Sequence, residues 1–347
     1  MLICTYEDRP ADFIGVKLLV ASLGRHLPDV PIHVACPAPD EGLRKWLLGR
    51  PNVVLDTAAA PGLRGWNVKA GLLLRLIDAG HREVIWIDSD VIVAGDFRPL
   101  IADTTSVIVT QEKCWNGPKD NMLRTRGWNL PVGRKLPDLI NSAFLRVTSE
   151  HRPLLLAWIA LMKTEIYQEA QTMPFERRPI HLISDQDVLG AVLGSQEFAH
   201  LPVRFLARGR DIIHDFQGGY SASDRISNLF RAMPPLVHAQ GHKPWRFPDK
   251  PRLIREPRHY YRFTQVESSP YSYLARQYRH ALPEFPAFFE VRSLPGKMLG
   301  ALSLHNLHIH GLPHALLDRG VDRIDRLKAL ARRFVGFGRR IRQAFDL

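Results

Sequence analysis

Two carboxylates one residue apart, Asp88 and Asp90, directly follow the apolar run 84–87, and a second apolar run, 91–93, begins straight after them. A buried strand that ends in Asp-x-Asp places two hard oxygen ligands at the rim of a sheet, where open α/β sheets bind their ligands. Divalent cations that also hold substrate phosphates prefer such oxygens. The pattern predicts a site for a metal ion and a diphosphate. The alternative is a strand that simply ends in a turn of Asp and Ser.

Polar residues also begin a helix that we expect near residue 185. Ser184 or Asp185 is a natural N-cap, and the helix dipole favours acids in the first turn, so capping alone explains these residue types. The functional interpretation is that Asp185, Gln186 and Asp187 line a polar pocket that holds the hydroxyl groups of a sugar.

A third group of polar residues follows the apolar run 236–237. It contains His238, Gly241 and Lys243. A neutral imidazole is a good third ligand for a metal such as Mn²⁺, and a lysine is a point-charge partner for phosphate. The alternative is a turn of His, Gly and Pro without chemistry.

The composition is that of an ordinary globular protein of 347 residues, 45% of them hydrophobic, and the length fits one large domain or two smaller ones. Three widely spaced cysteines, Cys4, Cys36 and Cys114, predict neither a disulfide framework nor a zinc site. Acidic residues appear too early in the chain for a signal peptide, and no apolar run is as long as a membrane span. We therefore expect a cytoplasmic protein in a reducing compartment.

The elements that must position these residues alternate between short apolar runs and segments with helical periodicity. We expect strands at 2–5, 31–35, 52–55, 84–87, 106–110 and 139–147, and helices at 13–27, 40–48, 66–79, 152–168 and 185–193. Such alternation predicts an α/β fold with a mainly parallel sheet flanked by helices. The loosely patterned segment 111–137 reads as a long loop, and loops of that length are often functional.

The C-terminal quarter is different in composition. A proline-rich segment, 243–258, suits a linker, so we expect one domain at 1–250 and a basic helical region at 251–347. The net charge is +12, and residues 251–347 hold 17 Lys and Arg against 8 Asp and Glu. Apolar and basic residues recur at near-helical spacing in 321–347, which predicts an amphipathic helix on an anionic membrane surface. The alternative is a helix packed on the core.

Four histidines in this quarter lie close together in sequence. They are His305, His308, His310 and His314. No carboxylate or cysteine joins them, so we interpret the cluster as structural rather than as a metal site.

Taken in order, these motifs resemble glycosyltransferase family 8. The family consists of retaining GT-A enzymes that include bacterial lipopolysaccharide galactosyl- and glucosyltransferases and glycogenin. The resemblance covers residues 1–246, with the triplet 141–143 as a further motif. It implies a GT-A, Rossmann-like fold and a nucleotide-sugar donor, usually a UDP-sugar. It also implies Mn²⁺, with Mg²⁺ as an alternative, held by Asp88, Asp90 and His238.

The resemblance also assigns the remaining site residues. Those implied to bind the donor and its nucleotide are Thr5, Tyr6, Glu7, Asp8, Lys69, Ser89, Asn141, Gly241 and Lys243. Among residues around the donor sugar, Gln186 is implied as a stabiliser at the reacting carbon, and Asp185 and Asp187 orient hydroxyls. Two departures mark a divergent member: one residue instead of two separates Gly241 from Lys243, and Asn-x-Gly is Asn-Ser-Ala here.

These assignments lead to a functional expectation. The chain transfers a sugar, with retention, to a glycan or a lipid-linked envelope acceptor, as in lipopolysaccharide biosynthesis. The acceptor is expected at 111–137, where Trp115 and Trp128 stack on sugar rings, and the enzyme is peripheral at the inner face of the membrane.

Two other functions remain open. A sugar nucleotidyltransferase on a related fold usually has a glycine-rich loop after the first strand, whereas residues 5–12 contain no glycine. A non-enzymatic protein that binds nucleic acid or membrane would use the basic C-terminal region, but no nucleic-acid motif is present, so we expect no specific nucleic-acid partner.

Overall fold

The computed structural model describes residues 1–58, 65–112, 120–215, 219–241, 243–246, 255–282, 290–303 and 306–320. The predictions made for Trp115 and for the tail 321–347 therefore lie outside the described residues.

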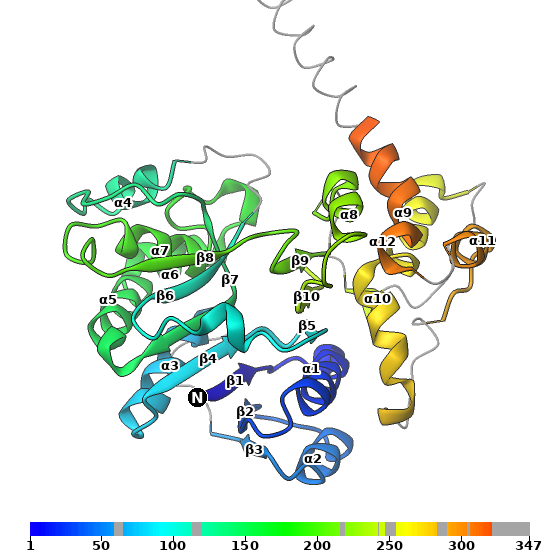
Figure 1. The fold of residues 1–347 in the computed structure, drawn as a ribbon. Coiled ribbons are helices and arrows are strands. Elements are labelled where there is room, and N and C mark those ends of the chain that lie inside the picture. Colours follow the sequence, from blue (N-terminus) through cyan, green and yellow to red (C-terminus); the bar gives the residue numbers. More distant parts are fainter. Residues whose placement is uncertain are drawn as a thin grey trace, which may run out of the picture.

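A seven-stranded sheet forms the centre of the molecule, in the order β3-β2-β1-β4-β7-β6-β8 (Figure 1). Six strands run in the same direction, and β7 alone is antiparallel to its neighbours. The strands are β1 Leu2–Tyr6, β2 Ile32–Ala35, β3 Val53–Asp56, β4 Glu83–Ile87, β6 Val107–Gln111, β7 Ile140–Thr148 and β8 Val203–Leu206. The prediction of an α/β fold with a mainly parallel sheet is confirmed.

The helices of this part also follow the sequence pattern. They are α1 Phe13–His26, α2 Glu41–Leu48, α3 Lys69–Asp78, α4 Met122–Gly127, α5 Arg152–Met162, α6 Glu165–Thr172, α7 Asp185–Leu193 and α8 Ala222–Asn228. One expected helix, 152–168, is wrong in its length: it divides into α5 and α6 because Thr164 has an extended backbone with ψ of 147°. The expected loop 111–137 contains the short helix α4.

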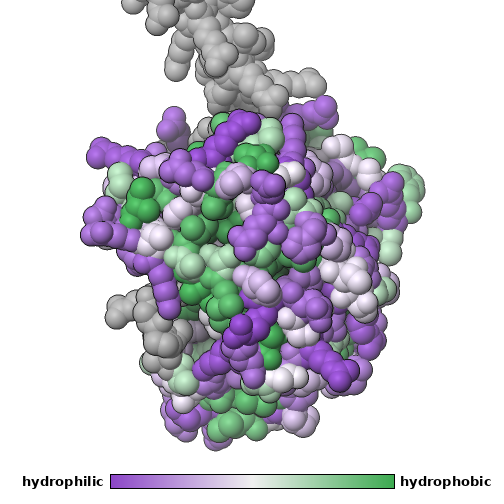
Figure 2. Space-filling model, turned by 90° about the vertical axis from the view of Figure 1, so that its left-hand side faces the viewer, coloured by the Kyte–Doolittle hydropathy of each residue, from purple (hydrophilic) through white to green (hydrophobic). Residues whose placement is uncertain are grey.

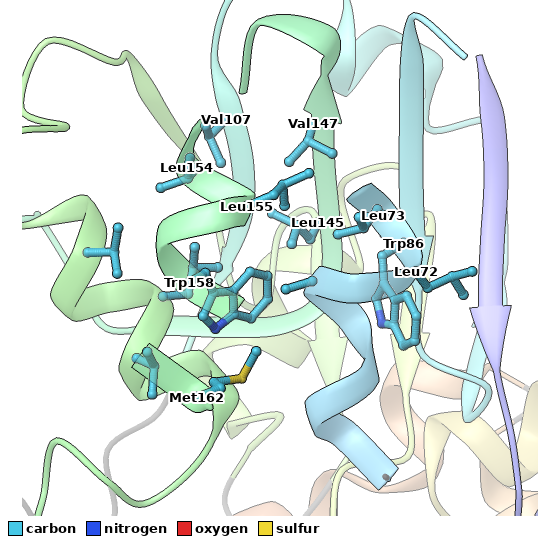
Figure 3. Packing of buried hydrophobic residues seen from close by; sticks show 14 of the residues in the cluster. Leu72, Leu73, Trp86, Val107, Leu145, Val147, Leu154, Leu155, Trp158 and Met162 are labelled. Atoms are coloured by element: carbon cyan, nitrogen blue, oxygen red, sulfur yellow. The ribbon is translucent and has the colours of Figure 1, made fainter. Parts of the chain in front are cut away.

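Helices cover both faces of the sheet. On one face, α3 and α5 pack on β4 and β7 through Leu72, Trp86, Leu145, Trp158 and their neighbours (Figure 3). On the other face, α1 and α2 pack on β1 and β2 through a second buried cluster. On the side of the molecule that carries α5 and α6, hydrophobic patches lie between hydrophilic side chains (Figure 2).

A second sheet has three short strands, and its first strand follows β4 along the chain after the Asp-x-Asp motif. It has the order β5-β10-β9, with β5 Val91–Val93, β9 Ile212–His214 and β10 Leu236–His238. In the antiparallel β5–β10 pair, His238 lies opposite Val91, which directly follows Asp90. This register places a residue from late in the chain beside the Asp-x-Asp motif.

Helices also form the C-terminal part of the described chain. They are α9 Pro257–Glu267, α10 Pro270–Ala275, α11 Leu294–Leu302 and α12 Leu307–His310, followed by helical residues 312–320. Tyr271, Leu274 and Leu307 share one buried cluster with Ile92 and Val237 of the small sheet. The helices therefore pack on the sheet-bearing part, and the division at residue 250 stays a prediction because 247–254 lie outside the described residues.

Of the four histidines that lie close together in the C-terminal quarter, His305 lies outside the described residues, and His308 and His314 make separate structural contacts. His308 Nδ1 lies 2.5 Å from the Tyr220 hydroxyl, and His314 Nδ1 lies 3.0 Å from Ser268 Oγ. Within the described ranges, no helix is both long enough and apolar enough to span a membrane.

Candidate active site

A cleft of about 780 Å³ opens at the carboxyl ends of β1 and β4. Parallel strands deliver their following loops to this edge, which is why motifs distant in sequence meet there. The predicted site residues that line the cleft are Tyr6, Glu7, Asp8, Lys69, Asp88, Ser89, Asp90, Asn141, Asp185, Gln186, Asp187, His238, Gly241 and Lys243. The structure does not bring Thr5 to the cleft, because its side chain is completely buried in β1.

The three predicted metal ligands come together. One ligand atom each from Asp88, Asp90 and His238 lies within 4.8 Å of the others. His238 Nε2 is 3.4 Å from Asp90 Oδ1. Two carboxylate oxygens and an imidazole nitrogen at this spacing fit a divalent cation with positions left for phosphate or water.

A second histidine fixes the ring of His238. His214 is the partner of His238 in the β9–β10 pair; its Nδ1 lies 3.0 Å from His238 Nδ1, and its Nε2 lies 3.0 Å from the carbonyl oxygen of Gln111. A carbonyl oxygen only accepts, so His214 Nε2 carries a proton.

The tautomer of His238 follows from this contact. Burial lowers the pKa of His214 well below its usual value, so the His214 ring is neutral and its Nδ1 accepts. His238 therefore donates from Nδ1, which leaves its Nε2, the atom that faces Asp90, as the one that would bind a metal ion. Sequence reasoning missed His214, although Ile212–His214 repeats the apolar-apolar-His pattern of Leu236–His238.

Two lysines balance the acidic group. Lys243 donates to Asp90 Oδ2. Burial alone would raise the pKa of Asp90, but Lys243, through its charge and its hydrogen bond, holds that pKa far below its usual range. The Asp90 carboxylate is therefore anionic when the cleft binds a cation.

Lys69 connects the acidic motif to the start of α7. Its Nζ lies 3.0 Å from Asp88 Oδ1, 2.7 Å from Ser142 Oγ and 3.7 Å from Asp185 Oδ2. Burial works to lower the pKa of Lys69, yet the carboxylates of Asp185 and Asp88 raise it above its usual value. Burial, with the nearby carboxylate of Asp88, raises the pKa of Asp185. Lys69 thus holds a positive charge between two acidic groups of the cleft.

A carboxylate that the sequence analysis did not single out holds three amide side chains. Glu112 accepts from Asn141 Nδ2 at 2.7 Å, from Gln186 Nε2 at 3.3 Å and from Gln240 Nε2 at 2.9 Å. Gln186 Oε1 accepts from the backbone N–H of Ser142 at 3.3 Å. Since a carboxylate only accepts and an N–H only donates, both contacts fix the same orientation of the Gln186 amide. The available sequence signal for Glu112 was its position two residues after the expected strand 106–110.

Other predicted residues are committed to internal pairs. Glu7 accepts from Ser89 Oγ at 2.7 Å and from Arg9 Nε at 2.7 Å. Asp187 accepts from Arg124 Nε at 2.6 Å and from Ser184 Oγ at 2.7 Å. These carboxylates shape the walls of the cleft through their internal pairs.

Trp128 does not line the cleft. Its ring packs near Tyr167 and His181, and its Nε1 donates to the carbonyl oxygen of His181 at 3.0 Å. The expected stacking of Trp128 on an acceptor sugar is therefore not supported, because the Trp128 ring packs against Tyr167 and His181.

No protein-family model and no curated protein matches the chain. Among solved structures, it is similar to the galactosyltransferase LgtC in complex with donor and acceptor sugar analogues, at 17% identity and a TM-score of 0.47, over 81% of this chain and 100% of that one. It is similar to the glycosyltransferase GlyE of Streptococcus pneumoniae TIGR4 at 14% identity and a TM-score of 0.46, over 80% of this chain and 63% of that one.

A third similar structure is the bifunctional glycosyltransferase WbbM, at 14% identity and a TM-score of 0.45, over 71% of this chain and 46% of that one. The chain therefore spans less than two thirds of the length of GlyE and of WbbM. All three structures are of glycosyltransferases. Identities this low leave the activity to be argued from the site itself.

Proposed function

We propose that this chain is a metal-dependent glycosyltransferase that moves a sugar from a nucleotide-sugar donor to a glycan or lipid-linked acceptor. The observation that carries the proposal is the group of Asp88, Asp90 and His238, whose ligand atoms lie within 4.8 Å of one another in the lining of a cleft of about 780 Å³. Carboxylates that hold a cation beside a lysine are suited to binding the diphosphate of such a donor.

The diphosphate end of the cleft is formed by the acidic group and Lys243. When bound there, a divalent cation, which we propose to be Mn²⁺ with Mg²⁺ as the alternative, offsets the negative charge that builds on the leaving diphosphate. Lys243 is paired with Asp90 and supplies a second positive charge to the same group. Tyr6 and Asp8, at the end of β1, line the cleft where we propose that the nucleoside, most simply uridine, binds.

The sugar end is formed by the start of α7 and by Asn141. Asp185, held by Lys69 and by Ser142 Oγ at 3.0 Å, is placed to accept from sugar hydroxyls. We propose that Gln186, whose amide is fixed by Glu112, stabilises positive charge at the reacting carbon and that the configuration is retained. Asp187, committed to Arg124, contributes by holding α7.

The acceptor and the location of the protein follow from the basic tail. We propose a lipid-linked envelope acceptor, as in lipopolysaccharide biosynthesis, and a cytoplasmic protein held at the inner membrane face by 321–347. Deleting 321–347 should abolish sedimentation with vesicles that contain anionic lipid while leaving the donor-dependent thermal shift intact. Equal sedimentation of the truncated protein would remove the anchor from the proposal.

The test of the proposed function is thermal stabilisation by UDP, GDP and CDP, each with and without Mn²⁺. A ligand that binds only the folded state raises the melting temperature as its concentration exceeds its dissociation constant. We expect a shift with UDP that needs Mn²⁺ and disappears in Asp88→Asn and in Asp90→Asn. The matched control is Asp96→Asn, because Asp96 is an exposed acid outside the cleft. A metal-independent shift, or none with any nucleotide, would contradict the proposal.

A further inference from the structure

Two large aromatic side chains are exposed in the wall of the cleft. Trp66 is 45% exposed and Phe175 is 53% exposed, and both line the same cavity as Asp88 and Asp185. Aromatic side chains of this size are usually mostly buried in a folded protein, because each removes a large apolar area from water. Their exposure beside a polar cleft calls for a ligand with an apolar face.

One helix holds the two segments that carry these aromatics. Tyr167 of α6 donates from its hydroxyl to Asn67 Oδ1 at 2.7 Å, which fixes the turn Gly65–Val68. Gln171 of α6 donates from Nε2 to the carbonyl oxygen of Leu182 at 2.8 Å, which fixes the loop after Phe175. Residues four apart lie on the same face of a helix, so both segments are tied to one face of α6.

The loop that carries Phe175 is held from inside by Arg178. Its Nη1 donates to Gln171 Oε1 and to the carbonyl oxygen of Ile183, both at 2.8 Å, and its Nη2 donates to the carbonyl oxygen of Gln171 at 3.0 Å. The guanidinium lies 5.8 Å from the centre of the Phe175 ring. The ring is thus exposed on a segment with a fixed shape, which lowers the entropy cost of binding.

Both aromatics belong to cleft-lining segments that lead to Lys69 and to Asp185. The loop of Phe175 leads directly into α7, which begins at Asp185. Trp66 lies three residues before Lys69, whose Nζ is 3.7 Å from Asp185 Oδ2. In the proposed function the start of α7 belongs to the end of the cleft that holds the donor sugar, and a second substrate must approach the reacting carbon from there.

We propose that Trp66 and Phe175 form the acceptor subsite and bind the apolar face of a saccharide ring; this rests on the proposed function. A sugar ring presents C–H groups on one face and hydroxyls at its edge, which matches aromatic rings beside a polar cleft. The Arg178 donors named above are used within the protein, which favours an uncharged saccharide over a phosphate as the group bound here. The subsite replaces the segment 111–137 as the expected place of the acceptor.

The experiment measures sugar binding and nucleotide binding separately. Saturation-transfer NMR reports binding of three probes, lactose, maltose and methyl N-acetylglucosaminide, to the full chain with UDP and Mn²⁺ present. Thermal shift reports the nucleotide. The variants are Trp66→Ala, Phe175→Ala and the conservative Trp66→Phe. The control is Phe230→Ala, because Phe230 is 86% exposed and does not line the cleft.

We expect the wild type to bind at least one probe and each alanine variant in the cleft to bind it roughly tenfold more weakly. The UDP shift should stay unchanged, and Trp66→Phe and Phe230→Ala should bind the probe as the wild type does. Probe binding that survives both alanine variants, or a wild type that binds none of the three, overturns the subsite. Loss of the UDP shift together with probe binding also overturns it, because the aromatics would then serve the donor.

The two proposals fail in different ways. A wild type without any metal-dependent nucleotide shift contradicts the proposed function. Loss of probe binding in Trp66→Ala and Phe175→Ala would, even then, support a saccharide subsite at this wall.

Discussion

Replacing His214 with phenylalanine removes both nitrogens that fix the ring of His238. In the structure His214 is completely buried, and it connects His238 Nδ1 to the carbonyl oxygen of Gln111 through two contacts of 3.0 Å. Without it, His238 is free to rotate or to carry its proton on Nε2, the atom that faces Asp90. We therefore expect the variant to fold with a weaker metal site.

The size of the effect follows from the role of His214 behind a ligand. Removing such a partner typically weakens metal binding by roughly 10- to 100-fold, which corresponds to about 1.4 to 2.7 kcal/mol. The variant also leaves the Gln111 carbonyl and the His238 N–H without their partner, at about 1–3 kcal/mol of folding stability for each. His214→Gln keeps one donor and one acceptor, so it should recover part of both losses.

The assay titrates the protein with Mn²⁺ at neutral pH and follows the electron paramagnetic resonance signal of the free ion. The control is His33→Phe, because His33 lies in β2 and contacts Asp56 away from the cleft. Circular dichroism confirms that each variant is folded. A folded His214→Phe variant whose Mn²⁺ affinity stays within about twofold of the wild type would refute the assignment of His214.

Three further predictions concern stability. A Cβ on Gly15 of α1 would lie 2.8 Å from a backbone oxygen of the acidic turn, whereas one on Gly24 of the same helix would meet nothing within 4 Å. Gly15→Ala should therefore destabilise the fold by about 1–3 kcal/mol, and Gly24→Ala should stabilise it by roughly 0.5–1 kcal/mol. Equal effects of the two substitutions in urea unfolding would contradict this difference. Trp158→Ala should lower the free energy of unfolding by about 3–5 kcal/mol because the side chain is fully buried. Leu156 is exposed on the same helix, so Leu156→Ala should lower it by less than about 0.5 kcal/mol. A small loss of stability in Trp158→Ala would argue against the packing in Figure 3. Burial, with a neighbouring arginine, lowers the pKa of His308 to about 4. Between that pH and about 6.5, the unfolded chain therefore binds more protons at this site than the folded chain does. The free energy of unfolding should fall as the pH drops through this range. His308→Asn should reduce that slope in thermal scans, and an unchanged slope would count against a buried neutral ring.

Much of the fold could be predicted because its signals are local. The apolar runs and their alternation with helical periodicity predicted the parallel strands and placed Asp88 and Asp90 at the carboxyl end of β4. The break between α5 and α6 was not predictable in this way, because the apolar pattern continues through Thr164 while the backbone there turns extended. Periodicity reports which face of a segment is buried and does not report where a helix must stop to pack.

The candidate site was predictable in its residue types and less so in its contacts. Strand ends supplied the acids, and fourteen of the fifteen predicted residues line one cleft. Glu112 and His214 were missed because their roles consist of what they touch: three amides in one case and a metal ligand in the other. Neither a carboxylate after a strand nor a histidine in a short apolar run is distinctive by itself.

The sequence by itself determined the chemical groups, their order along the chain and the strand ends that present Asp88 and Asp90, since strand and helix formation depends on neighbours a few residues away. Only the tertiary structure decided which groups act together. The β5–β10 register brings His238 to Asp90, and Asp187, in the wall of the cleft, is paired with Arg124. Packing also exposes Trp66 while it buries Thr5. The physical reason is that hydrogen bonds and burial depend on contacts between segments far apart in sequence, which local residue preferences do not encode.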